Sequence, residues 1–347
     1  MKRKTYLLLT FFVFTQVSPG LELKKRIRGN IAPKSIAHSG NGLFFAQNMM
    51  YRHSITVYNR DFDLIATISD KIKGDLLDSR KYAGEYRGAP VEATFSYSGK
   101  YAWVTNYLMS GPGFENPGND SCYGSRNFDI SYVYRINTET MKVDQAVAVG
   151  SVPKYIEASP DNRWVLVSNW CSGDVSVIDT ERGIEAKKIR VGRYPRGIVV
   201  DSASAIAYVA VMGSYDIAAI NLGDMSLSWI KGVGRSPRHL ALDPSGRYLY
   251  ASLNAENRIA KIDVSNRSVV RKVQRGDTPR SIVISDNGKF LYVVNYESNT
   301  LSKVDCSTMN VVETVHTDHH PIGITYDAQS RQVWVSCYSG TIQVFQD

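Results

Sequence analysis

Five prolines recur at a constant interval from residue 153 to residue 321. Successive members of this series are 42 residues apart: Pro153, Pro195, Pro237, Pro279 and Pro321. Each one opens an apolar run, as in "PRGIVV" (195–200) and "PRSIVI" (279–284). A fixed period of this length is typical of repeat proteins, in which each repeat is one supersecondary unit that buries its apolar face against its neighbours.

Two earlier prolines extend the series toward the N-terminus. Pro33 lies in "IAPKSIAHS" and Pro90 in "GAPVEATFS", which match the same pattern. The interval between them exceeds the period by 15 residues, and the interval from Pro90 to Pro153 exceeds it by 21. The sequence therefore predicts seven repeats, with insertions at about residues 72–86 and 108–130.

The internal order of each repeat indicates strands. Apolar runs of five to seven residues alternate with turn sequences such as "SDNGK", "ESN" and "CSTM", and turn formers of this kind separate strands. The runs have neither the length nor the period of ordinary helices. We predict an all-β chain in which residues 21–347 form a single seven-bladed β-propeller of four-stranded antiparallel blades.

The two ends of the chain favour a closed ring. The last repeat is one strand short, and "LELKKRIRGNIAP" (21–33) resembles "EAKKIRVGRYP" (185–195), which ends an outer strand. We expect the N-terminal segment to complete the last blade, which removes an open sheet edge.

The second strand of several repeats carries a family motif: "AWVTNY" (102–107), "VLVSNW" (165–170), "LYVVNY" (291–296) and "VWVSCY" (333–338). From about residue 22 to 347 the chain resembles the YVTN-type, or YncE-like, β-propeller repeat family, which includes periplasmic proteins. Two repeats depart from the motif, with "AYVAVM" (207–212) and "YASLN" (250–254). Related propellers include lactonases, partners of quinoproteins and haem domains, and surface-layer proteins, so the resemblance implies the fold and leaves the function open.

The first twenty residues resemble a secretory signal. Basic "MKRK" precedes apolar "TYLLLTFFVFT" and the small residues Ser18 and Gly20, which predicts a signal peptide over residues 1–20 and a periplasmic or secreted protein. A retained N-terminal anchor is the alternative. No membrane span is expected in the mature chain. Removing the signal lowers the formal net charge of +8 by three, and the remaining positive charge favours anionic partners.

The residue that follows each proline is usually cationic. In an antiparallel meander these residues begin the strand nearest the axis, at the face that we call the top, where the central channel opens. They are Lys34, Val91, Lys154, Arg196, Arg238, Arg280 and Ile322. Five like charges around one opening repel each other, and an anion would relieve that repulsion. The alternative is a set of solvated cations inherited with the repeat.

Aromatic residues end the second strand on the same face. These are Tyr107, Trp170, Tyr296 and Tyr338, with His320 at a neighbouring corner. They either pack between blades or offer ring faces to a ligand. Both insertions are also expected on the top. "HTDHHP" (316–321) has metal-binding residue types without an established ligand spacing, so no metal is predicted. No CxxCH is present, and no cofactor is expected.

The cysteines divide into two pairs by their place in the repeats. Cys122 lies in the second insertion and Cys171 in the top turn of the next blade. An exported protein meets oxidising conditions, so we predict a disulfide between these two. Cys306 ends a third strand on the opposite face and Cys337 belongs to a distant blade, so both are expected to be free and buried.

These features predict an exported, monomeric, non-enzymatic binding or scaffold protein. Its basic mouth would bind an anionic partner: single-stranded nucleic acid, a nucleotide-like or acidic ligand, or an acidic protein surface. The alternative is a lactonase- or lyase-like enzyme with its site at the same mouth. Because the acidic residues of the top turns, such as Glu297, are spread over several blades, no catalytic residue is assigned.

Overall fold

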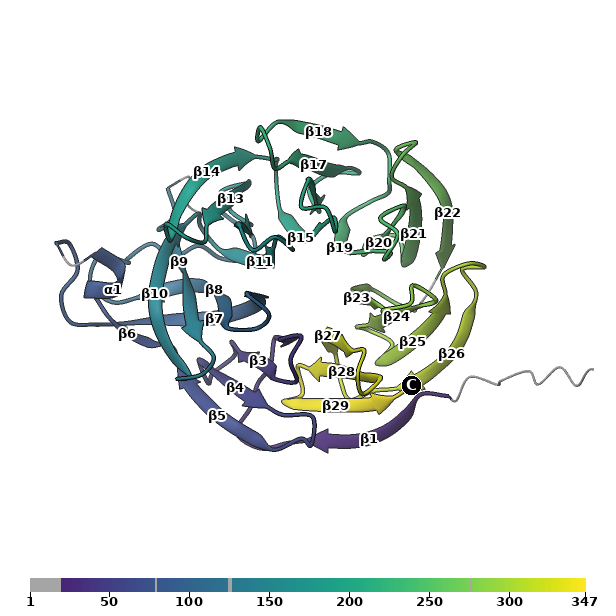
Figure 1. Ribbon diagram of the computed structural model, residues 1–347, viewed down its shortest axis with the longest axis horizontal. Helices are drawn as coiled ribbons and strands as arrows, with labels where there is room; N and C mark the ends of the chain where they lie inside the picture. Colours follow the sequence, from purple (N-terminus) through teal and green to yellow (C-terminus); the bar gives the residue numbers. More distant parts are fainter. Residues whose placement is uncertain (1–19, 79, 124–126, 275) are drawn as a thin grey trace, which may run out of the picture.

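The chain forms seven antiparallel sheets arranged radially around a central channel (Figure 1). A computed structural model describes residues 20–78, 80–123, 127–274 and 276–347. The expected signal peptide lies outside these residues except for Gly20. The all-β, seven-bladed prediction is confirmed.

The first four blades follow one another around the ring. From the axis outward, blade 1 contains β2 (Ser35–His38), β3 (Phe44–Asn48), β4 (Ser54–Tyr58) and β5 (Leu64–Ser69). Blade 2 contains β7 (Glu85–Ser96), β8 (Tyr101–Ser110), β9 (Ser131–Asn137) and β10 (Lys142–Val149). Blade 3 contains β11 (Pro153–Ala158), β12 (Trp164–Asn169), β13 (Asp174–Asp179) and β14 (Ile184–Arg190). Blade 4 contains β15 (Pro195–Val200), β16 (Ile206–Val211), β17 (Ile217–Asn221) and β18 (Leu227–Ile230).

The remaining three blades complete the circle. Blade 5 contains β19 (Pro237–Leu242), β20 (Tyr248–Leu253), β21 (Arg258–Asp263) and β22 (Ser268–Gln274). Blade 6 contains β23 (Pro279–Ile284), β24 (Phe290–Asn295), β25 (Thr300–Asp305) and β26 (Val311–His316). Blade 7 contains β27 (Pro321–Asp327), β28 (Gln332–Cys337), β29 (Thr341–Gln346) and, outermost, β1 (Glu22–Ile27).

The burial of each strand follows its distance from the axis. Second strands such as β12 and β24 are buried at every residue, because the adjacent blades cover both of their faces. The outermost strand β26 alternates between half-buried and exposed residues, since one of its faces meets solvent. The apolar core therefore lies between neighbouring blades, as where Phe44 of blade 1 stacks on Trp334 of blade 7 with ring centroids 3.9 Å apart.

The N-terminal strand closes the ring as the sequence predicts. β1 pairs antiparallel with β29, from Glu22 opposite Gln346 to Ile27 opposite Ile342. Two ion pairs accompany this closure. Lys303 of blade 6 pairs with Asp347, which follows β29, and Arg60 of blade 1 pairs with Asp327 of blade 7. We call these two pairs the closure lock.

Blade 2 carries both insertions and departs from the common pattern. The segment of the first insertion projects outward (Figure 1) and forms a short fifth strand, β6 (Lys71–Lys73), which pairs with the start of β7, and one helical turn, α1 (Asp75–Asp78), which contacts β10. This insertion thus lies at the outer edge of blade 2, away from the mouth. It packs on the second insertion through an aromatic cluster of Tyr82, Tyr86 and Phe114. Among the described residues, no helix is long and apolar enough to cross a bilayer.

Candidate anion-binding mouth of the channel

The proline corners of blades 2 to 7 contain a bulge that turns the next side chain inward, whereas the pairing of blade 1 is regular from Ser35 onward. In blade 4, Pro195 lies opposite Val211, and regular pairing resumes only at Ile198 opposite Val209. Blades 5 and 6 have the same irregularity after Pro237 and Pro279. A bulge redirects the side chain at the point where pairing is interrupted. The bulge therefore explains how a cation that follows proline comes to face the channel.

The corner is also strained. The residue before each of five prolines has a positive φ, between 54° and 61°, although none is glycine: Val152, Tyr194, Ser236, Thr278 and His320. This conformation is unfavourable for most side chains, above all for β-branched ones. Such strain persists only where the surrounding structure enforces it, and it is often found at functional sites.

The five cations converge at the top of the channel. Lys34, Arg196 and Lys154 are only 6%, 5% and 8% exposed, and Arg238 and Arg280 are partly buried. Burial lowers the pKa of Lys34, and the neighbouring charge of Arg196 lowers it further. The pKa of Arg238 is lowered by the same two causes. We call these five residues the mouth cations.

The ammonium of Lys34 lacks a hydrogen-bond acceptor in the part of the chain that the structure describes, and Glu92 is a nearby carboxyl that acts on its charge. The Lys34 Nζ atom is buried. The nearest ring, Tyr338, has its centroid 5.9 Å away. Arg280 likewise leaves its Nε without an acceptor among the described residues. Buried donors in native structures are normally satisfied, so each of these two atoms is a candidate contact for an acceptor.

The aromatic residues predicted on the same face as the cations lie in contact with them. Lys154 Nζ lies 4.7 Å from the ring centroid of Trp170 and 5.1 Å from that of Tyr107. The guanidinium of Arg280 lies 3.5 Å from the ring centroid of Tyr296. Cation–π contacts of this kind stabilise a cation that has lost its water. The rings thus hold the cations in place.

The second insertion brings one carboxylate to the mouth. Asp120 forms an ion pair with Lys154 and accepts a hydrogen bond of 3.0 Å from the Tyr107 hydroxyl. Although the Asp120 side chain is largely exposed, partial desolvation opposes its ionisation, and Lys154 and Tyr107 together outweigh this and hold the pKa of Asp120 below its usual value. For Lys154, burial and Arg196 outweigh Asp120 and lower the pKa to about 8.

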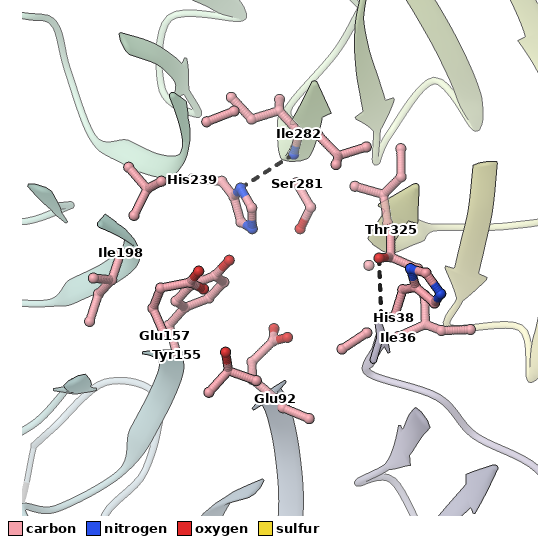
Figure 2. Close-up of a pocket in the computed structure, with 18 of the residues that line it drawn as sticks. Ile36, His38, Glu92, Tyr155, Glu157, Ile198, His239, Ser281, Ile282 and Thr325 are labelled. Atoms are coloured by element: carbon pink, nitrogen blue, oxygen red, sulfur yellow. Dashed lines mark hydrogen bonds between the residues drawn. The ribbon is translucent and has the colours of Figure 1, made fainter. Parts of the chain in front are cut away.

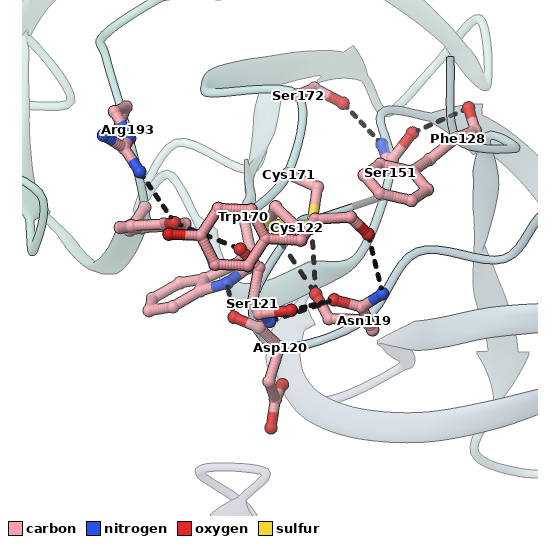
Figure 3. Close-up of a disulfide and its surroundings, with 12 residues drawn as sticks. Asn119, Asp120, Ser121, Cys122, Phe128, Ser151, Trp170, Cys171, Ser172 and Arg193 are labelled. Atoms are coloured by element: carbon pink, nitrogen blue, oxygen red, sulfur yellow. Dashed lines mark hydrogen bonds between the residues drawn. A yellow bond between two sulfur atoms is a disulfide. The ribbon is translucent and has the colours of Figure 1, made fainter. Parts of the chain in front are cut away.

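A disulfide fixes the insertion to blade 3. Cys122 and Cys171 are joined, with their Cα atoms 5.3 Å apart, and this is the pair that the sequence favours (Figure 3). Nearby, Trp170 Nε1 donates a hydrogen bond of 2.8 Å to the Asp120 carbonyl oxygen. The other cysteines, Cys306 and Cys337, are free and buried as expected.

His320 takes part in a stack at the edge of the mouth. Its ring lies on Tyr296 with centroids 4.1 Å apart, and its Nε2 is 3.6 Å from Glu297 Oε2. The sequence did not pair these two residues. Among the described residues, no group of three or more His, Cys, Asp or Glu side chains could hold a metal ion.

Several channel residues escape the sequence analysis. Glu92, Tyr155 and His239 stand at the second position after their prolines and face the channel, and Glu157 stands at the fourth (Figure 2). Burial raises the pKa of Glu92, while Lys34 and Arg196 act in the opposite direction. The sequence could have predicted these residues from the repeat. The second residue after most of the prolines faces the channel, as the first one does. The repeat does not predict Asp120.

A family model described as a YNCE-like beta-propeller matches residues 128–344, more than half of the chain. The match includes four of the mouth cations, Lys34 being the exception. No curated protein matches the chain.

Proposed function

The chain belongs to the YNCE-like β-propeller family, and on that premise we propose that it is an exported, non-enzymatic protein whose channel mouth binds the anionic group of a ligand. The observation that carries this proposal is the buried ammonium of Lys34, which has no acceptor among the described residues and lies among other cations. An anion at this position would supply the missing acceptor and reduce the repulsion between the mouth cations.

The depth of the mouth cations favours a compact anionic group. Because Lys34 and Arg196 are almost fully buried, only a group that enters the opening can reach them. The aromatic rings are in contact with the protein's own side chains: Trp170 with Lys154 and Tyr194, and Tyr296 with Arg280 and His320. They are therefore poor stacking platforms for successive bases. A phosphate or carboxylate end group fits better than a nucleic-acid strand lying across the face.

The test is calorimetric titration with pyrophosphate at low ionic strength. Arg196→Met should weaken binding at least tenfold, because a charge-assisted hydrogen bond in a buried site contributes roughly 1.5–3 kcal/mol. The matched control is Arg193→Met, which removes the same charge from an exposed position three residues away. It should change the affinity less than twofold. Equal losses in both variants would contradict a specific site.

A phosphorylated oligothymidylate distinguishes the nucleic-acid alternative. Single-strand binding across the top would have a salt slope of about 0.7 per phosphate neutralised. If the salt slope corresponds to several phosphates and pyrophosphate does not bind, the ligand is a nucleic-acid strand and not a compact anion. Binding that does not depend on salt would exclude an electrostatic mouth altogether.

Export is supported by two features. The first twenty residues have the pattern of a signal peptide, and the disulfide between Cys122 and Cys171 is stable in an oxidising compartment. N-terminal sequencing of the protein purified from the exported fraction should begin near residue 21. A chain that retains residues 1–20 in the membrane fraction would contradict cleavage.

The pairing of His320 with Glu297 favours a second candidate, a lactonase- or lyase-like enzyme. A carboxylate beside an imidazole can orient a general base. The expected result for such an enzyme is activity on a panel of lactones that is lost in Glu297→Gln and His320→Ala. Activity that persists in both variants, or is absent from the wild-type protein, would exclude this site.

A further inference from the structure

A second group of polar side chains lines the channel below the mouth cations. A cavity of about 450 Å³ lies there, and its lining includes Glu92, Tyr155, Glu157, His239 and Ser281. Figure 2 shows Glu92, Tyr155, Glu157 and His239 pointing into the channel from the inner strands of three blades. Tyr155 and Glu157 are two residues apart on β11, so they share one face of the strand.

Two of these groups are free to bind. Among the residues that the structure describes, neither the Glu157 carboxyl nor the Tyr155 hydroxyl has a hydrogen-bond partner. His239 accepts a hydrogen bond of 3.5 Å at Nδ1 from the backbone N–H of Ile282 (Figure 2). The proton of a neutral imidazole is then on Nε2, which is left to donate to a ligand.

All three groups are uncharged at neutral pH. Burial raises the pKa of Glu157 to about 8 and also raises that of Tyr155. Burial, followed by the charges of Arg196 and Arg238, lowers the pKa of His239 to about 3. A protonated carboxyl and a phenol each offer both a donor and an acceptor, and the imidazole of His239 adds the donor at Nε2. Hydroxyl groups, which also donate and accept, are their natural partners.

Charge disfavours the other possible occupants of this layer. The effect of Arg196 and Arg238 on His239 means that their positive potential reaches this depth, so an ammonium group would be repelled. A second anion would have to lie beside Glu92, which lines the same cavity and is itself acidic. A neutral polar group avoids both penalties.

We infer that the lower channel binds the neutral, hydroxyl-bearing part of the ligand whose anionic group lies at the mouth. The ligand is thus a phosphorylated or carboxylated polyol or sugar. This inference rests on the proposed function, because the mouth cations set the orientation of the ligand. Lys154 and Glu157 are three residues apart on β11, so the two layers are separated by roughly 10 Å. A linear hexitol phosphate is long enough to contact both.

The experiment compares three phosphates by calorimetry with the wild-type protein. We expect sorbitol 6-phosphate to bind at least tenfold more tightly than inorganic phosphate and than hexyl phosphate, whose tail has the same carbon count and no hydroxyl. This comparison requires no variant. Phosphate binding without a gain for sorbitol 6-phosphate would overturn the subsite and leave the mouth proposal standing. Failure of all three phosphates to bind would overturn both.

Variants of Glu157 test whether the tighter binding of sorbitol 6-phosphate depends on the lower channel. Glu157→Leu should remove most of the tenfold gain while inorganic phosphate binds within twofold of the wild-type affinity. Glu157→Gln should retain most of the gain, because the amide still donates and accepts. The matched control is Glu181→Gln, at an exposed position of the same blade, which should leave all affinities unchanged. A gain that survives in Glu157→Leu would overturn the assignment.

Discussion

Two buried lysines have opposite surroundings. Lys303 in the closure lock is 1% exposed, and its ammonium pairs with the carboxylate of Asp347. That carboxylate also accepts a hydrogen bond of 2.5 Å from the Tyr292 hydroxyl. Lys34 at the mouth is 6% exposed and has no acceptor among the described residues. The same residue type is thus satisfied at one place and left without a partner at the other.

The other half of the closure lock repeats the satisfied pattern. Arg60 contacts both carboxylate oxygens of Asp327, at 2.5 and 3.1 Å, which is the strong bidentate geometry. Burial opposes the ionisation of Asp327, but its hydrogen bonds with Arg60 and Ser330 lower its pKa to about 2.

The difference between the two lysines indicates that one contributes to stability and the other to function. A buried charge is tolerated when it is paired, and it destabilises the fold when it is not. In the closure lock, Arg60–Asp327 joins the first and last blades and Lys303–Asp347 joins blades 6 and 7, so both pairs stabilise the contacts of the last blade. We expect the unpaired ammonium of Lys34 to reduce the stability of the fold, which is the cost of a preformed binding site.

The largest effect should follow from breaking the closure lock. Lys303→Met leaves the buried Asp347 with Arg331, 3.7 Å away, as its remaining cation. Removal of one partner of a buried pair costs about 3–5 kcal/mol, and we expect a loss at the lower end of this range. Urea unfolding should report a loss of this size. Lys289→Met, an exposed change on the same blade, is the control and should have little effect. A loss below about 1 kcal/mol would mean that the lock contributes little to closure.

The disulfide provides the next test, because it joins the mouth to the rest of the ring. The double variant Cys122→Ser/Cys171→Ser removes a crosslink between residues 49 apart in sequence and should lower the free energy of unfolding by about 2–4 kcal/mol. With Asp120 released, Lys154 gains freedom to bind a ligand, so pyrophosphate affinity should rise severalfold. Reduced wild-type protein should behave in the same way. A fall in affinity would show that Asp120 helps to build the site.

A lysine-to-methionine substitution at the mouth should change the free energy of unfolding in the opposite direction to Lys303→Met. Lys34→Met removes an unpaired buried charge, and such replacements are neutral or stabilise by roughly 1–4 kcal/mol. We expect a gain near the lower end, together with at least a tenfold loss of pyrophosphate affinity. Urea unfolding and calorimetry measure the two effects. Lys24→Met on the exposed strand β1 is the control. Destabilisation comparable to that of Lys303→Met would abolish the distinction between the two regions.

The sequence predicts what the repeat encodes. The period of the prolines gives the number of blades, and the resemblance of residues 21–33 to an outer strand gives the closure. The mouth cations are predictable for the same reason, since Lys154, Arg196 and Arg238 occupy equivalent positions in successive repeats. Their convergence depends on the bulges and positive φ angles of the corners, which no composition pattern reveals.

Features outside the repeat could not be predicted. The contact of Asp120 with Lys154 comes from an insertion whose path is set by one disulfide and by packing on blade 2. The first insertion adds β6 to blade 2 and lies at its outer edge, because its aromatic residues bury themselves against Phe114 and not over the channel. Glu92 and Glu157 look like ordinary strand residues until the ring brings them together.

The smallest expected effect is a dependence of stability on pH that comes from the mouth. Lys154 has a folded pKa of about 8, against an ordinary value of 10.5. Between these values the unfolded chain holds a proton that the folded chain has released, so stability should rise with pH by up to about 1.4 kcal/mol per unit. Below the folded pKa both states hold the proton, and this contribution to the slope vanishes.

Urea unfolding of the wild-type protein and of Lys154→Met at pH 8.0, 8.75 and 9.5 measures this slope. The variant should lose the part of the rise that comes from Lys154 and keep the part that comes from Lys34, whose pKa is also lowered. Loss of the Lys154 ammonium leaves little buried charge behind, because the Asp120 side chain is 78% exposed. Lys187→Met, at an exposed position of blade 3, should keep the wild-type slope. The range ends at pH 9.5 because tyrosines ionise near pH 10 in the unfolded chain, which acts in the opposite direction. Equal slopes in the wild-type protein and Lys154→Met would mean that Lys154 keeps its proton through its pair with Asp120. Lys154 at the mouth would then be a satisfied ion pair like those of the closure lock. The contrast between the two regions would rest on Lys34 alone.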